Sequence, residues 1–108
     1  MDISEAVSDI NRCILRIQRD NEQVARILGE IVQGILKDPG LNNQARQEIM
    51  ENLRTVAWEA SLASTQRQLG VVKAALAYIP SLLSQDIDVL KHFQGHLWQL
   101  KTFFGIAK

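Results

Sequence analysis

Residues 3–35 have the sequence ISEAVSDINRCILRIQRDNEQVARILGEIVQGI, in which a seam position recurs at alternating intervals of four and three residues. The positions with this spacing are Ile3, Val7, Ile10, Ile14, Ile17, Asn21, Val24, Leu28, Ile31 and Ile35. A heptad repeat of this length is typical of a long helix that buries a narrow seam against other helices. We therefore predict one helix from about residue 3 to residue 37, which Pro39 and Gly40 bring to an end.

Asn21 is the one polar member of the seam. If it is buried, it would pair with another Asn21 or with a backbone carbonyl and so define the register of the helices. Alternatively, residue 21 is a partly solvated position where the seam meets water. The flanking positions are also rich in apolar residues, which favours packing against two or more helices over a two-stranded coiled coil. These flanking residues are Ala6, Cys13, Ala25, Ile27 and Val32.

Three further helices are predicted, each bounded by a capping or breaking residue: 42–64 after Asn42, 71–79 before Pro80, and 82–104 before Gly105. Between the second and third helices the apolar pattern weakens, which predicts a turn or distortion around residues 64–70. Short connections favour antiparallel neighbours. The expected fold is all-α, a four-helix bundle in a single domain over residues 1–108.

The predicted first helix is longer than its neighbours can cover. It would span about 50 Å, whereas the second and fourth helices would span about 30 to 35 Å each. The remaining apolar turns need the short third helix or another molecule to cover them. We therefore expect a non-enzymatic protein–protein interaction module that self-associates, or acts as an adaptor for a helical partner, through the seam.

The residues expected at this interface come from two helices: Ile10, Ile14, Ile17, Asn21, Val24, Leu28, Trp58 and Leu62. Trp58 and Leu62 lie off the main apolar stripe of their helix. Large apolar groups in such positions either contact a second helix layer within the domain or anchor an interface.

Composition excludes several classes of function. The chain has 12 basic and 12 acidic residues and a formal net charge of zero, so no large electrostatic surface for nucleic acid or anionic membrane is expected. Its single cysteine, Cys13, rules out an intrachain disulfide and a cysteine-built metal site. No apolar run approaches the roughly 20 residues that a membrane span requires, and no signal peptide is evident. These features predict a cytoplasmic protein.

Little in the sequence indicates catalysis. His92 and His96 are four residues apart with Asp88 one turn earlier, a spacing at which imidazoles chelate a divalent metal. No further dedicated ligand accompanies them, so we expect a solvated polar face and no metal or other cofactor. Phosphate-binding glycine loops and nucleophile motifs are also missing, and Cys13 is expected to be a small buried apolar residue. The prediction is a protein that is not an enzyme and has no evident small-molecule substrate.

Four arginines share one flank of the predicted first helix: Arg12, Arg16, Arg19 and Arg26. Such a stripe could hold phosphate groups, and a small nucleic-acid-binding regulator is therefore the alternative function. Against it, Asp9, Glu22 and Glu30 lie among the arginines at the spacings of ordinary surface ion pairs. No tyrosine or phenylalanine interleaves with them to stack on bases, so nucleic acid is the less favoured partner.

Three stretches in the second half of the chain form a further pattern: Ala45 to Leu53 with Glu48 and Glu51, the run Gly70 to Leu76, and the closing Leu90, Trp98 and Phe103 to Ile106. Over residues 41–106 the chain resembles a helical module at the carboxyl end of many uncharacterised bacterial proteins linked to conflict and signalling systems. It departs from that module in having Ser64 to Arg67 where a proline-bearing loop is usual, and in having no catalytic domain ahead. The resemblance implies an accessory or adaptor role and transfers no active-site residues.

Overall fold

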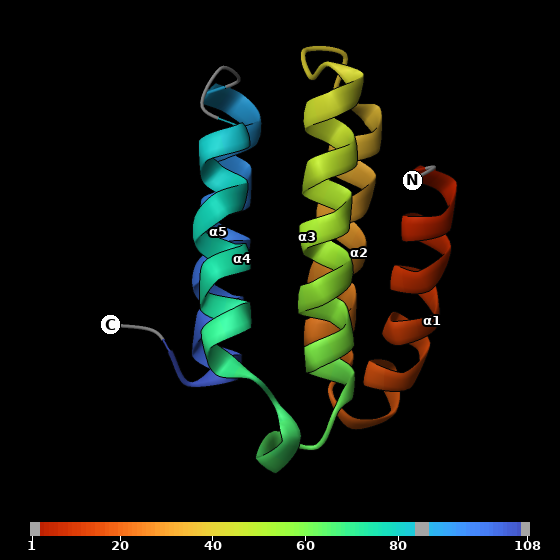
Figure 1. The fold of residues 1–108 in the computed structure, drawn as a ribbon, viewed down its shortest axis with the longest axis vertical. Helices are drawn as coiled ribbons and strands as arrows, with labels where there is room; N and C mark the ends of the chain where they lie inside the picture. Colours follow the sequence, from red (N-terminus) through yellow and green to blue (C-terminus); the bar gives the residue numbers. More distant parts are fainter. Residues whose placement is uncertain (1–2, 84–86, 107–108) are drawn as a thin grey trace.

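The computed structural model describes residues 3–83 and 87–106, which form an all-α bundle measuring 37 × 31 × 22 Å. Its helices are α1 (Ile3–Asp20), α2 (Glu22–Lys37), α3 (Asn43–Ser61), α4 (Leu69–Leu82) and α5 (Ile87–Phe104), with a short 3₁₀ turn η1 (Ser64–Gln66). Successive helices run in opposite directions (Figure 1).

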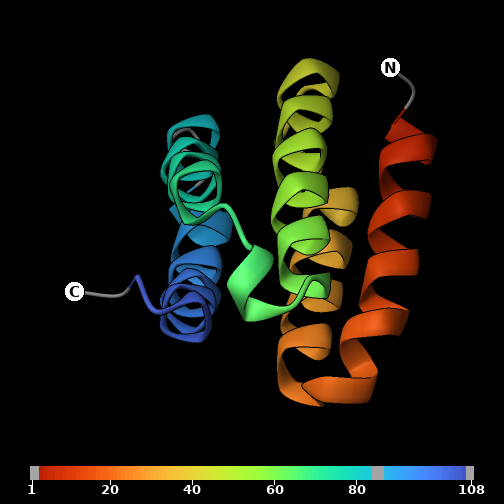
Figure 2. The ribbon, with the colours of Figure 1, turned by 60° about the horizontal axis from the view of Figure 1, so that its bottom comes forward.

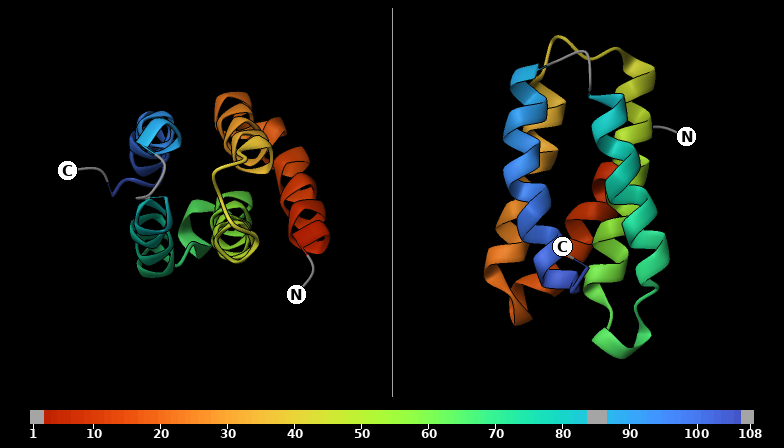
Figure 3. Two further views of the ribbon diagram at one scale, coloured as in Figure 1. Left: turned by 90° about the horizontal axis from the view of Figure 1, so that it is seen from above. Right: turned by 90° about the vertical axis from the view of Figure 1, so that its left-hand side faces the viewer.

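Helices α2 to α5 form a four-helix bundle, and α1 packs on its outside. Seen from above, α2, α3, α4 and α5 occupy the corners of a square, and each contacts the next around it (Figure 3). Helix α1 lies outside this square against α2 and α3, with its most extensive contacts to α3. Helices α2 and α3 are therefore the two central ones, because α2 touches α1, α3 and α5, and α3 touches α1, α2 and α4.

The prediction of one long first helix is wrong. The chain reverses at Asn21, and α1 and α2 form a hairpin with a single residue between them (Figure 2). Asn21 has an extended backbone (φ −152°, ψ 91°), and its side-chain oxygen accepts a hydrogen bond of 3.1 Å from the Val24 amide. Asparagine competes for backbone hydrogen bonds in this way and is a preferred N-cap, so residue 21 begins a new helix.

The second predicted helix is confirmed as α3, which ends slightly earlier than expected. The Asn42 side chain caps it by accepting a 2.7 Å hydrogen bond from the Ala45 amide. The break expected at residues 64–70 is also confirmed, as an extended connection that contains η1.

The third predicted helix, 71–79, was too short. Helix α4 extends to Leu82 with Pro80 inside its last turn. Proline lacks an amide donor and its ring crowds the carbonyl four residues earlier, but the helix has only two residues left to run. The Leu83 amide closes it by donating to the carbonyls of Ile79 and Pro80. The fourth helix was predicted from residue 82, whereas α5 begins at Ile87 after residues that lie outside the described part.

Gly105 ends α5 as expected. Its φ of +76° is the left-handed conformation that glycine adopts without a Cβ clash. The Gly105 and Ile106 amides donate to the carbonyls of Thr102 and Lys101, which satisfies acceptors of the last turn.

Arg46 ties the end of α2 to the start of α3. Its guanidinium donates to the backbone carbonyls of Ile35, Asp38 and Leu41 at 3.2, 2.6 and 3.1 Å. The Ile35 carbonyl lies in the last turn of α2, where carbonyls lack partners within the helix, and those of Asp38 and Leu41 lie in the connection that follows. The Arg46 side chain thereby holds the connection between the two helices.

Arg67 performs the same task after α3. It donates to the carbonyls of Glu59 and Leu62 at 3.1 and 3.2 Å and to that of Ala60 at 3.3 Å. Its guanidinium carbon also lies 4.5 Å from the centre of the Phe103 ring, a cation–π distance. Arg67 therefore joins the end of α3 to the end of α5.

Candidate interaction groove between α1 and α3

A groove of about 440 Å³ lies between α1 and α3 on the outside of the bundle. Residues from both helices line it: Asp9, Arg12, Cys13 and Arg16 from α1, and Arg54, Thr55 and Trp58 from α3. We call this the α1–α3 groove. It exists because the reversal at Asn21 places α1 beside α3 (Figures 2 and 3).

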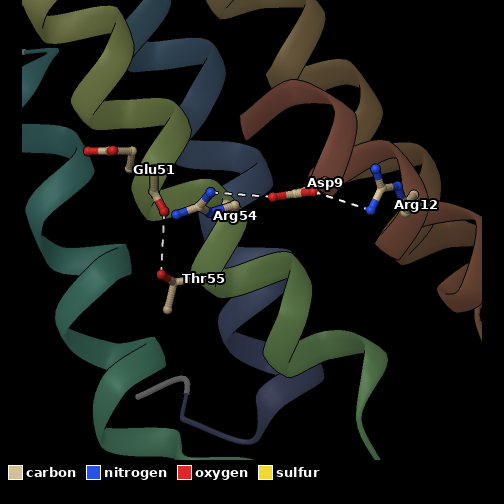
Figure 4. Close-up of polar contacts among 5 residues, drawn as sticks. All are labelled: Asp9, Arg12, Glu51, Arg54 and Thr55. Atoms are coloured by element: carbon tan, nitrogen blue, oxygen red, sulfur yellow. Dashed lines mark hydrogen bonds and ion pairs between the residues drawn. The ribbon is translucent and has the colours of Figure 1, made fainter. Parts of the chain in front are cut away.

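Three arginines and one aspartate supply the charge of the groove. Arg54 Nη1 lies 3.3 Å from one carboxylate oxygen of Asp9, and Arg12 Nη1 lies 3.6 Å from the other (Figure 4). Arg12 is the more exposed of these two cations. The Glu51 carboxylate points away from Arg54, while Thr55 donates to the Glu51 backbone carbonyl (Figure 4). Asp9 is the only acidic residue among the described residues that line the groove, so the lining is positive.

Trp58 supplies the apolar part of the groove. Its side chain is 48% exposed, although neighbouring residues of α3 are among the most deeply buried in the protein. An exposed indole beside guanidinium groups combines two of the three side-chain types most enriched in the energetically dominant parts of protein interfaces. Leu62, the other residue of this segment expected at an interface, is the C-cap of α3; it is half-buried and is not part of the groove lining.

Cys13 lines the groove but is 6% exposed. Burial raises the pKa of the Cys13 thiol, and a hydrogen bond with Ser61 and the charge of Arg16 oppose the shift more weakly. A thiol in this state is a poor nucleophile because only the thiolate reacts.

We expect Cys13 to react with iodoacetamide at least about tenfold more slowly in the folded protein than in the chain unfolded by guanidinium chloride, at one pH near 8. Cys13 is the only cysteine, so the mass increase reports on this residue alone. Equal rates in the two states would show that the thiol is accessible and contradict the buried position.

The seam residues lie inside the single chain. Ile10, Ile17, Val24 and Leu28 are all buried, and Ile14 is partly buried against the same core. Asn21 is half-buried at the reversal. This agrees with the interpretation of residue 21 as a partly solvated position at the edge of the seam. The seam is covered because the hairpin halves the length that the neighbouring helices must match. The expected uncovered turns of a 50 Å helix do not occur.

The four arginines do not form one stripe. Arg12 and Arg16 line the α1–α3 groove, and Arg19 is exposed near the end of α1. Arg26 is on α2 and lines a different hollow, between α1 and α2, together with Gln18 of α1. A stripe along one flank requires one continuous helix, and the reversal at Asn21 removes it.

The histidine pair lies on α5, with ring centres of His92 and His96 4.7 Å apart. His96 Nε2 is 3.1 Å from a carboxylate oxygen of Glu30 on α2, but the two atoms are not aligned for a hydrogen bond. Asp88 is exposed. Among the described residues, no three histidine, cysteine or acidic side chains are grouped closely enough to hold a metal ion.

Comparison with protein-family models, with curated proteins and with solved structures yielded no match to this chain. The resemblance of residues 41–106 to a bacterial helical module therefore stays a prediction. Within residues 3–83 and 87–106, no helix has the length and apolarity needed to cross a bilayer.

Arg54 and Thr55 are the groove residues that sequence reasoning missed. Arg54 is 45 positions from its partner Asp9, and neither residue belongs to a motif that indicates a site. The only available signal was the placement of Trp58 off the apolar stripe, four residues after Arg54.

Proposed function

We propose that the protein is a non-enzymatic protein–protein interaction module whose α1–α3 groove binds an acidic segment of a partner. The observation that supports this proposal best is the arrangement of three arginines from two helices around a half-exposed tryptophan. The lone cysteine is consistent with a role in a reducing compartment such as the cytoplasm.

Charge complementarity favours an acidic partner. The guanidinium group presents donors in a planar fork that matches a carboxylate, and it remains charged at every physiological pH. Arg12 and Arg16 are one helical turn apart, so their side chains project as neighbours from the same side of α1. A partner helix with glutamates four residues apart presents carboxylates at the matching interval.

Trp58 gives the groove a surface for an apolar side chain. The exposed part of the indole would be buried by an aliphatic residue that follows the carboxylates along the partner. Removing that area from water contributes about 25 cal/mol per Å², and the arginines then provide orientation and specificity. The resulting mode is an amphipathic helix seated in a groove.

The test uses fluorescence titration with an acidic amphipathic peptide that carries leucines and paired glutamates. The Trp98→Phe variant serves as the background because the chain has two tryptophans and Trp98 is also exposed. We expect the emission of Trp58 to change on binding. The double reversal Arg12→Glu and Arg16→Glu should raise Kd by at least about tenfold, or ~1.4 kcal/mol.

Arg19→Glu with Arg26→Glu is the matched control, since it makes the same change of charge outside the groove. The proposal requires this control to bind the peptide nearly as well as the unmodified background. Equal loss in the two double variants would point to nonspecific electrostatics and contradict the groove. Tighter, salt-sensitive binding of a duplex oligonucleotide of equal charge, lost in both variants, would favour the nucleic-acid alternative instead.

A further inference from the structure

The hairpin of α1 and α2 retains the heptad of a continuous helix. Seam residues continue at the same spacing on both sides of Asn21, with Ile17 before it and Val24 after it, and both are buried. Nothing in the packing of a hairpin requires that its two helices share one unbroken heptad phase across the turn. The shared phase is what a single helix over residues 3–37 requires.

The hairpin and a continuous helix over residues 3–37 differ in the backbone conformation of one residue, Asn21. The Asn21 amide donates to the Ile17 carbonyl at 2.7 Å, and the Ala25 amide donates to the Asn21 carbonyl at 3.2 Å. Both are bonds between residues four apart, as in a continuous α-helix. A change of φ and ψ at residue 21 alone, with release of its side-chain cap on Val24, would join α1 to α2.

Straightening the hairpin removes α1 from α2 and α3 and exposes its apolar face. That face includes Ala6, Ile10 and Cys13, which are all buried in the closed chain. Helices α2 and α3, which α1 covers in the closed chain, carry buried apolar residues of their own. Two opened copies can cover both exposed faces, because the α1 of each copy packs on the α2 and α3 of the other.

The helix directions permit this exchange. In the closed chain α1 runs antiparallel to α2 (Figure 1). When two straightened helices are related by a two-fold axis near residue 21, the α1 half of each lies antiparallel to the α2 half of the other. The contacts that α1 makes with α2 and α3 in the closed chain are then restored between copies, which is the closed symmetry of a domain-swapped dimer.

We propose that the protein forms a dimer by exchanging α1, with residues 3–37 as one helix and the two Asn21 side chains near the two-fold axis. The α1–α3 groove survives the exchange. Asp9, Arg12 and Arg16 of one copy then face Arg54 and Trp58 of the other. The dimer does not depend on what the groove binds.

A disulfide that forms only between α1 and α3 distinguishes this dimer from other associations. The Cys13 thiol lies within hydrogen-bonding reach of the Ser61 hydroxyl, so Ser61→Cys places two thiols together. The variant is concentrated, separated into monomer and dimer by size-exclusion chromatography, and each fraction is oxidised. We expect covalent dimers from the dimer fraction on a non-reducing gel and monomers with an internal disulfide from the monomer fraction.

Residue 21 controls the balance between the two forms. The Asn21→Leu variant loses the N-cap of α2 and places an apolar residue at position 21 of the seam in both copies of the dimer. The dimer association constant should therefore rise by at least about tenfold. Asn21→Ala should act in the same direction to a smaller extent and serves if the leucine variant folds poorly. Two glycines inserted after Asn21 lengthen the hinge and should lower the dimer fraction.

Sedimentation equilibrium over a hundredfold concentration range measures this balance, and circular dichroism confirms that each variant is folded. Folded leucine and alanine variants that remain monomeric throughout would overturn the proposal. So would a dimer fraction in which oxidation yields only internal disulfides, since α1 would then still pack on its own chain.

Discussion

The Leu28→Ala variant is expected to unfold with a free energy about 3 to 4 kcal/mol lower than that of the parent protein. Leu28 is 0% exposed and lies on α2, the helix that touches α1, α3 and α5. Removal of its side chain beyond Cβ leaves a cavity that surrounding helices fill only in part, and the cost includes both lost burial and the cavity. Urea denaturation followed by circular dichroism measures the change.

The matched control is Leu15→Ala, which deletes the same atoms from a leucine that is 66% exposed on α1. A change within about 0.5 kcal/mol is expected there because little burial is lost. Equal destabilisation of the two variants would contradict the buried position of Leu28 between α2 and its neighbours. A small domain has a total stability of about 5 to 15 kcal/mol, so the Leu28 variant should also melt at a visibly lower temperature.

The heptad predicted which face of each helix is covered, even though it predicted the wrong helix and a cover from another molecule. Ile10, Ile17, Val24 and Leu28 are buried whether the seam is straight or folded back, because each half keeps its own apolar stripe. A stripe defines which face of a helix is covered and does not identify what covers it. The decision between the two conformations rests on Asn21, whose capping preference is a local effect that a seven-residue average conceals.

The groove was less predictable than the core. Arg12, Arg16 and Trp58 were all singled out from the sequence. The two arginines were assigned to nucleic-acid binding by the first predicted helix, and Trp58 to a protein interface on the second. Only the reversal at Asn21 brings α1 against α3 and places the three together with Arg54. Positions of side chains across a helix–helix contact depend on which helices pair, and hydrophobic periodicity within one helix carries no information on that pairing.

The second large effect is expected from Arg67, although its sequence context is an unremarkable polar turn. We predict that Arg67→Ala lowers the free energy of unfolding by about 2 kcal/mol. The loss leaves the carbonyls of Glu59, Ala60 and Leu62 without this donor at the end of α3. It also removes the cation from the Phe103 ring, which weakens the link between α3 and α5.

The Arg67→Lys variant distinguishes the contribution of the guanidinium hydrogen bonds from that of the positive charge. Lysine keeps the positive charge, but its ammonium group is a point charge that cannot reproduce the planar donors reaching carbonyls on different sides. We therefore expect lysine to restore less than half of the stability lost in the alanine variant, and Arg19→Ala, at an exposed position on α1, to change it little. Full rescue by lysine in urea denaturation would show that charge alone matters at residue 67. The end of α3 would then be held by electrostatic attraction, and the directed hydrogen bonds of the guanidinium would contribute nothing to stability.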